Sequence, residues 1–139
     1  MSLTRTLDIA GSALSAQSVR LNTVASNLAN AETVSSEAAS AYRARLPVFA
    51  SVLAARTGDT HPAGLGVRVA GIVESGAEPV TEYRPDHPLA DASGYVYRPN
   101  VNLMEELADL ISASRSYQTN VEVMNTSKQL LLKTLELGA

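Results

Sequence analysis

The fold of this chain is decided by residues 102–137, NLMEELADLISASRSYQTNVEVMNTSKQLLLKTLEL, which contain no glycine or proline. A row of mostly apolar residues runs through this stretch in alternating steps of four and three: Leu103, Leu107, Leu110, Ser114, Tyr117, Val121, Met124, Lys128, Leu131 and Leu135. An average spacing of about 3.5 residues is typical of a helix that lies along another helix. At about 1.5 Å per residue, such a helix is on the order of 50 Å long. We therefore expect a long helix that needs a partner.

The predicted helix has a defined start and favourable charges at both ends. Asn102, with Glu105 three residues later, forms the asparagine version of a capping box. Further acidic residues follow in the first turns, and Lys128 and Lys133 lie near the end. Both groups of charges complement the helix dipole, so they favour a helix with these limits.

A second helix is predicted over residues 3 to about 30. Its leucines recur every seven residues, at Leu7, Leu14, Leu21 and Leu28. The intervening steps of three and four fall on Leu3, Ala10, Gln17 and Val24. The same pattern describes one face of an ordinary surface helix, because periods of about 3.5 and 3.6 differ little over this length. Since the two segments share one spacing, we expect them to pair as an antiparallel-type coiled coil.

The middle of the chain predicts a small β insertion. Residues 34–60 are interpreted as a loop followed by a short strand or helical turn that Pro47 interrupts. Residues 65–73, 79–83 and 95–97 are predicted strands. Between the last two, Asp91 near Gly94 is interpreted as a turn former. The predicted fold is mainly α with this insertion, in three segments: an N-terminal helix at 1–33, a β-containing segment at 34–100 and a C-terminal helix at 101–139.

Composition excludes several classes of protein. The chain has 139 residues, enough for one ordinary domain, and its aromatic content of 4% favours helix–helix packing over a compact aromatic core. It contains no cysteine, which excludes disulfides and thiolate chemistry. The net charge is -3 and the basic residues do not cluster, so no nucleic-acid partner is expected. Neither a cleavable signal nor a membrane-length apolar run is present, so no membrane insertion is expected.

No pattern of catalytic or metal-binding residues stands out. The two histidines, His61 and His87, are each followed by proline, and neither has a second histidine at helical spacing. Asp86 beside His87 could form an acid–base couple, but within a proline-rich turn a solvated surface pair is the better interpretation. We therefore predict that the chain is not an enzyme, and we expect no cofactor and no metal.

Apolar residues outside the main row of the C-terminal helix predict a subunit interface. Val123, Leu130 and Leu137 form another row spaced by seven, and Leu132 adds apolar surface in the same turns. One partner helix cannot cover both rows, and exposed leucines favour association. Two asparagines in this helix, Asn120 and Asn125, are either exposed or buried as hydrogen-bonding residues that specify register.

Three stretches resemble the flagellar axial proteins of bacteria, the family of rod, hook and related subunits. They are SNLANAET at residues 26–33, HPLADASGYVYRPNVN at 87–102 and ISASRSYQTNVEVMNTSKQLLLKTLELG at 111–138, and the last two are closest to a proximal rod subunit. The residues that carry the family motif are Asn27, Asn30, Ala31, Ser112, Ser114, Arg115, Tyr117, Asn120, Val121, Asn125, Lys128 and Leu131.

The resemblance implies a structural subunit of the proximal rod of the flagellar basal body, which serves motility. Such a subunit assembles with its own copies and other rod proteins into a hollow helical drive shaft that transmits torque and lets export substrates pass. Implied partners are the basal-body ring, the adaptor at the rod base and the flagellar type III export apparatus. The implied location is the periplasmic rod, reached from the cytoplasm without a cleaved signal peptide. From the residues alone, the alternative is a soluble coiled-coil adaptor that binds a partner helix in the cytosol.

Overall fold

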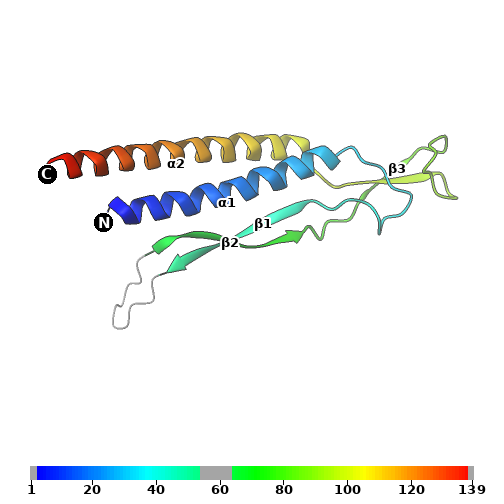
Figure 1. Ribbon diagram of the computed structural model, residues 1–139. Coiled ribbons are helices and arrows are strands. Elements are labelled where there is room, and N and C mark those ends of the chain that lie inside the picture. The colour runs from blue at the N-terminus through cyan, green and yellow to red at the C-terminus, as the bar shows by residue number, and fades with distance from the viewer. Residues whose placement is uncertain (1–2, 54–63, 138–139) are drawn as a thin grey trace. The chain divides into compact units, whose positions relative to one another are not determined.

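The computed structural model describes residues 3–53 and 64–137 of the chain. Along the sequence it contains α1 (Leu3–Asn30), β1 (Arg45–Leu53), β2 (Gly64–Glu74), β3 (Val80–Tyr83), β4 (Tyr95–Arg98) and α2 (Leu103–Leu137) (Figure 1). The helices hold 28 and 35 residues, about half of the chain. The strands form two separate two-stranded antiparallel sheets, β1–β2 and β3–β4. The predicted combination of two terminal helices with β structure between them is confirmed.

Of the two alternatives for the middle segment, a short strand or a helical turn, the structure shows a strand. It is longer than expected, because residues 45–53 form a continuous strand of nine residues through Pro47. Proline lacks a backbone donor but is tolerated where a strand has a free edge, and each strand of a two-stranded sheet has one.

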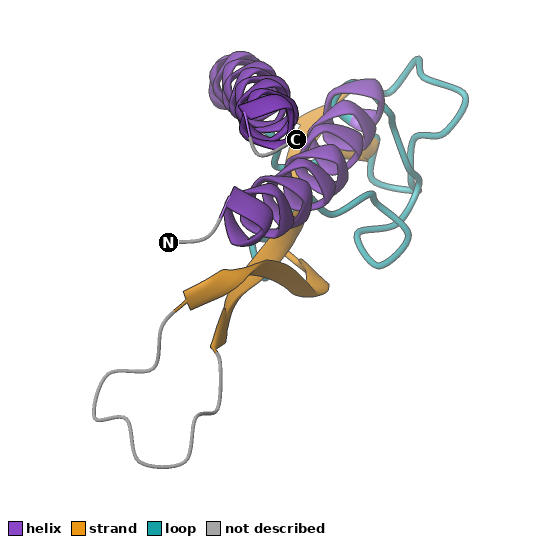
Figure 2. Ribbon diagram, turned by 60° about the vertical axis from the view of Figure 1, so that its left-hand side comes forward, coloured by secondary structure: helices purple, strands orange, loops and turns teal. Residues whose placement is uncertain are grey.

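The chain divides into two compact units, and the first comprises residues 1–21, 47–71 and 112–139. Within it, α1 lies next to the β1–β2 ribbon in both views (Figures 1 and 2). The backbone N–H of Val67 donates to Ser12 Oγ at 3.1 Å, and that hydroxyl donates to the carbonyl of Ile9 at 2.8 Å. On α2, the methyl group of Met124 comes within 3.6 Å of where a Cβ on Gly11 would lie. Segments of both helices therefore pair in this unit.

Gly66 allows β2 to approach α1 closely. Its φ is +143°, and an added Cβ would lie 3.0 Å from Ser12 Cβ and closer still to Ser12 Oγ. A side chain at this position would be strained and would also push apart the groups that form the Ser12–Val67 hydrogen bond.

The second unit comprises residues 22–46 and 72–111. The β3–β4 register pairs Glu82 with Val96, whose side chain is fully buried. On the other edge of β4, Ser35 exchanges two backbone hydrogen bonds with Tyr97, both 2.9 Å, so the loop after α1 is joined to the sheet. Arg98 adds ion pairs with Glu32 (2.8 Å) and Glu82 (3.4 Å).

The connection between β3 and β4 is an ordered turn built on Asp91, as the sequence predicts. Its Oδ1 accepts the backbone N–H groups of Ser93 (2.8 Å) and Tyr95 (2.9 Å). The Tyr95 bond is the main reason why the pKa of Asp91 is lowered below its usual value. Gly94 has a φ of +82° and lies against the ring of Tyr83, where an added Cβ would come within 2.9 Å of the ring.

The predicted cap of α2 at Asn102 is confirmed, while the return bond from Glu105 that would complete a capping box stays a prediction. Asn102 Oδ1 accepts the backbone N–H of Met104 at 3.1 Å, and its carbonyl accepts the N–H of Glu106 at 3.0 Å. No helix in the described part of the chain is long and apolar enough to cross a membrane.

Candidate functional site

The side chain of Asn27 forms a buried polar site in the second unit. It is 1% exposed. Its Oδ1 accepts the backbone N–H of Arg45 at 2.8 Å and the hydroxyl of Tyr42 at 2.9 Å. Its Nδ2 donates to the carbonyl of Arg45 at 2.9 Å and to Glu106 Oε1 at 3.0 Å. All four hydrogen-bonding positions of the amide are therefore occupied.

These four bonds join three segments that are distant in the sequence. Asn27 belongs to the end of α1, Arg45 begins β1, and Glu106 lies in the first turns of α2. Because the amide bonds both backbone groups of Arg45, it takes the place of a neighbouring strand for that residue. We call Asn27, Tyr42, Arg45 and Glu106 the Asn27 centre.

Glu106 is the titratable group of this centre. Burial raises its pKa, the hydrogen bond from Asn27 acts in the opposite direction, and the charges of Asp109 and Glu105 raise the pKa further. Tyr42 has a structural role, since its hydroxyl also lies 3.2 Å from Ser26 Oγ. The centre therefore holds segments together and lacks a nucleophile activated by a base.

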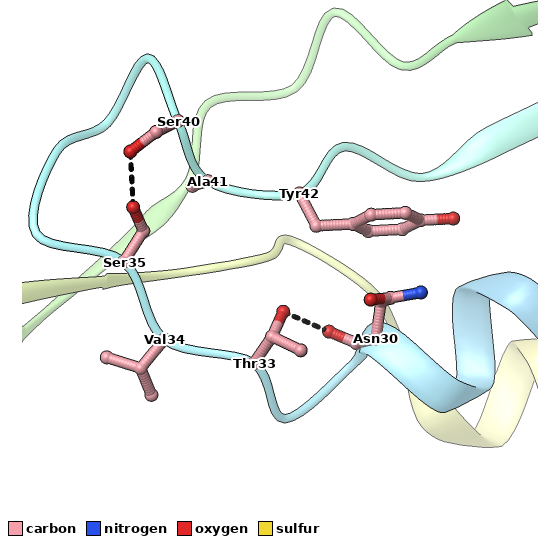
Figure 3. Close-up of a pocket in the computed structure, with 7 residues that line it drawn as sticks. All are labelled: Asn30, Thr33, Val34, Ser35, Ser40, Ala41 and Tyr42. Carbon is pink, nitrogen blue, oxygen red and sulfur yellow. Dashed lines mark hydrogen bonds between the residues drawn. The ribbon is translucent and has the colours of Figure 1, made fainter.

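Beside this centre, an open pocket of about 320 Å³ lies between the end of α1 and the loop that follows it (Figure 3). Its lining consists of uncharged side chains: Asn30, Thr33, Val34, Ser35, Ser40, Ala41 and Tyr42. Thr33 Oγ1 donates to the carbonyl of Asn30 at 2.7 Å, and the hydroxyls of Ser35 and Ser40 bond to each other (Figure 3). With no carboxylate or imidazole in its lining, the pocket offers only neutral hydrogen-bonding groups.

The predicted seam residues of α1 are half-buried, and smaller residues beside them are fully buried. The leucines of this row are Leu7, Leu14, Leu21 and Leu28. Ala10, Val24 and Ala31, on the intervening row, are 2–3% exposed, and so is Ala16 on a further row. Apart from Asn27, small side chains thus occupy the most enclosed positions of α1.

On α2, the predicted seam residues differ in exposure. Leu110, Ser114, Val121, Met124 and Leu131 are half-buried. Leu103, Leu107, Tyr117, Lys128 and Leu135 are exposed, from 37% at Tyr117 to 63% at Leu135 among the apolar ones. The two fully buried side chains in the described helix are Ala113 and Ser127, each one position before a residue of the predicted row. Which row forms the seam between the helices remains a prediction.

The predicted interface residues all lie at the surface. Val123 is 39% exposed, Leu130 49%, Leu132 52% and Leu137 89%. Their role in an interface remains a prediction.

The motif residues of the resemblance fall in different surroundings. Asn27 and Ala31 are buried, and Asn30 donates to the carbonyl of Ser26 at 2.8 Å. On α2, Asn120 donates to the carbonyl of Ser116 at 2.8 Å within its own helix. Ser112, Arg115 and Asn125 are exposed.

The structure also places the two histidines that were considered for chemistry. His87 Nδ1 accepts the backbone N–H of Leu89 at 3.1 Å, a local turn contact. His61 lies outside the described residues.

Comparison with known proteins identifies the family. A family model described as "Flagella basal body rod protein" matches residues 7–35, and one described as "Flagellar basal body rod FlgEFG protein C-terminal" matches residues 92–137. Flagellar basal-body rod protein FlgC of Yersinia enterocolitica is 54% identical over 138 residues, which cover 99% of each chain. FlgC of Salmonella typhimurium is 52% identical over the same share, and FlgC of Bacillus subtilis is 38% identical over 149 residues and 99% of each chain.

The two matched regions contain most of α1, with Asn27, and the whole of α2. The relatives extend over nearly the full length of the chain and carry one name. The chain therefore belongs to the FlgC family of flagellar basal-body rod proteins and is a structural subunit of the basal-body rod.

Proposed function

We propose that the two terminal helices pair as a coiled coil and that copies of this pair, packed against neighbouring rod subunits, form a hollow drive shaft. In this proposal the shaft transmits torque and leaves a passage for export substrates. The observation that supports it is the surface of α2. Of its 35 residues only Ala113 and Ser127 are fully buried, although the helix is rich in leucine.

The energetic argument concerns the large apolar side chains that α2 leaves at the surface. The exposed ones are Leu103, Met104, Leu107, Ile111, Tyr117, Val123, Leu130, Leu132, Leu135 and Leu137. Full burial of such a side chain stabilises by roughly 1.5–3 kcal/mol, so covering half-exposed ones contributes about 1 kcal/mol each. Neighbouring subunits that cover several of them supply several kcal/mol, which makes the assembled rod the favoured state of this surface.

The finer partners follow from the same role. Membership of the rod family implies assembly with other rod and basal-body proteins. We propose in addition that the chain travels through the flagellar type III export apparatus without a cleaved signal and contacts the adaptor at the rod base. Its work is mechanical rather than catalytic, in keeping with a central site made of saturated hydrogen bonds.

A surface substitution on α2 tests the proposal. In cells that lack their own copy, we expect Leu130→Asp to abolish motility and to remove the chain from detergent-resistant basal bodies. Gln129→Asp, at the neighbouring exposed position, is the matched control and should support swimming. A chain truncated after Gln118 should fail like Leu130→Asp. Motile cells with either the truncated chain or Leu130→Asp would contradict the role of α2 in assembly.

A further inference from the structure

The exposed face of the β3–β4 sheet carries an aromatic platform. The rings of Tyr83 and Tyr95 meet edge to face, with centroids 5.2 Å apart and an interplanar angle of 62°. Tyr83 is nevertheless 63% exposed and Tyr95 42%. Gly94 and Pro85 lie close together beside Tyr83, since a Cβ on Gly94 would come within 2.9 Å of that ring and 3.2 Å of Pro85 Cβ. The ring of Tyr83 therefore contacts its neighbours and is still largely exposed.

A pocket of about 440 Å³ lies at this platform, lined by Tyr83, Arg84, Pro85, Asp86, His87 and Pro88. This volume is within the range of small-molecule sites in proteins, about 300–1,000 Å³. All of these residues belong to the second unit, and most of them lie in the turn after β3. The pocket shares no residue with the Asn27 centre.

The pocket contains polar groups that can donate hydrogen bonds and others that can accept them. His87 Nδ1 accepts the N–H of Leu89 at 3.1 Å, which leaves the proton of the neutral ring on Nε2, as a donor. Arg84 Nη2 is held by Glu82 Oε1 at 2.8 Å. Asp86 is exposed and forms no hydrogen bond or ion pair within the described residues, so its two carboxylate oxygens remain available as acceptors.

We propose that this pocket binds a sugar ring of a neutral oligosaccharide. One face of a pyranose ring consists of C–H groups, which pack on an aromatic ring, and its edge carries hydroxyls that donate and accept. Tyr83 supplies the flat apolar surface, Asp86 accepts from neighbouring hydroxyls, and His87 donates. An extended peptide fits the site less well, because the lining contains no Leu, Ile, Val or Met side chain to receive a peptide side chain. The proposal does not depend on rod assembly.

Titration of the purified full-length chain with the tetramers of N-acetylglucosamine and of glucose tests this inference. We expect binding of at least one tetramer with a Kd on the order of 1 mM, measured by calorimetry or by chemical-shift changes in residues 83–88. Tyr83→Ala should weaken binding by about three- to tenfold, as loss of a ring contact predicts, while Tyr83→Phe should retain it.

Two further variants separate recognition from folding. Asp86→Asn removes the charged acceptor in a side chain that forms no bond in the described structure, so it should weaken binding while the chain stays folded. Glu78→Gln, at another exposed acid of the same unit, should bind as the unmodified chain does. If neither tetramer binds, or if Tyr83→Ala and Asp86→Asn both bind as tightly as the unmodified chain, the proposal is wrong.

Discussion

Replacing Asn27 by alanine tests whether the Asn27 centre determines how the segments of its unit are joined. The substitution removes four hydrogen bonds of 2.8–3.0 Å at a position that is 1% exposed. Tyr42 can still reach Ser26, and Glu106 is half-exposed and can turn to water. The N–H and carbonyl of Arg45 both lose their partner. Arg45 is an exposed residue, so water can reach these groups. At about 0.5–1.5 kcal/mol for each of the two hydrogen bonds to Arg45, we expect a loss of about 1–3 kcal/mol in unfolding free energy.

Urea denaturation of the purified chain, followed by circular dichroism, measures this loss directly. Asn22→Ala is the matched control, because Asn22 is an exposed asparagine of the same helix and the same unit. We expect the control to remain within about 0.5 kcal/mol of the unmodified chain. Amide exchange at Arg45 in purified basal bodies gives a second measurement, and it should accelerate only in Asn27→Ala.

A charged replacement sharpens the test. Asn27→Asp can still accept from Arg45 and Tyr42, but it donates nothing and brings a carboxylate next to Glu106. At neutral pH, Asn27→Asp should lower the unfolding free energy at least as much as Asn27→Ala does. On acidification one of the two carboxyl groups becomes protonated, so the unfolding free energy should rise again. If Asn27→Ala loses less than about 1 kcal/mol, or Asn27→Asp shows no recovery in acid, our explanation of the centre is wrong.

Three further perturbations test other parts of the structure by unfolding in urea. Gly66→Ala should lower the unfolding free energy by about 1–3 kcal/mol, because φ is +143° and the new Cβ meets Ser12. The control Gly71→Ala, where no atom lies within 4 Å of an added Cβ, should change it little. An equal effect of the two substitutions would contradict the close approach of β2 to α1. Burial raises the pKa of Glu106, so stability should fall as pH rises past its ordinary 4.5 toward the folded-state value, and Glu106→Gln should lack this fall. The lowered pKa of Asp91 acts oppositely: stability should fall as pH drops below 3.8. Asp91→Asn should reduce this fall and leave the part that comes from the lowered pKa of Glu82, so a fall of unchanged size in Asp91→Asn would refute the prediction.

Local patterns predicted both helices well. The predicted start of α1 at residue 3 and its end near residue 30 agree with the structure, and Asn102 caps α2. A period of about 3.5 residues and a capping asparagine depend only on residues within a few turns of each other, so they can be read from the sequence. The sequence left open whether the segment around Pro47 is a short strand or a helical turn, because β1 depends on pairing with β2 and a proline is a local signal against a strand.

The Asn27 centre could not be predicted for a related reason. Asn27 bonds to residues 15, 18 and 79 positions away, and no spacing rule connects them. The resemblance to axial proteins marked Asn27 as a motif residue but gave it no partner. A similar limit applies to α2, where the period predicts a helix but not which of two adjacent rows faces α1. Neighbouring residues differ by about 100° around the helix, and leucines occur on both sides of the row that contains Ala113 and Ser127.

The distribution of side-chain size connects the fold of this chain with its place in the rod. In most domains large apolar residues fill the interior and small ones are found anywhere. Here the enclosed positions of the helices are held by alanine, serine, threonine, valine and asparagine, while most leucines of α2, with Met104 and Ile111, lie at its surface. Small residues let segments approach closely, and the fully hydrogen-bonded amide of Asn27 then fixes their arrangement. The contacts within the chain therefore form with little burial of apolar surface. In the rod assembly that we propose, contacts between subunits would supply the larger apolar burial, so we expect the isolated chain to be less stable than the assembled one.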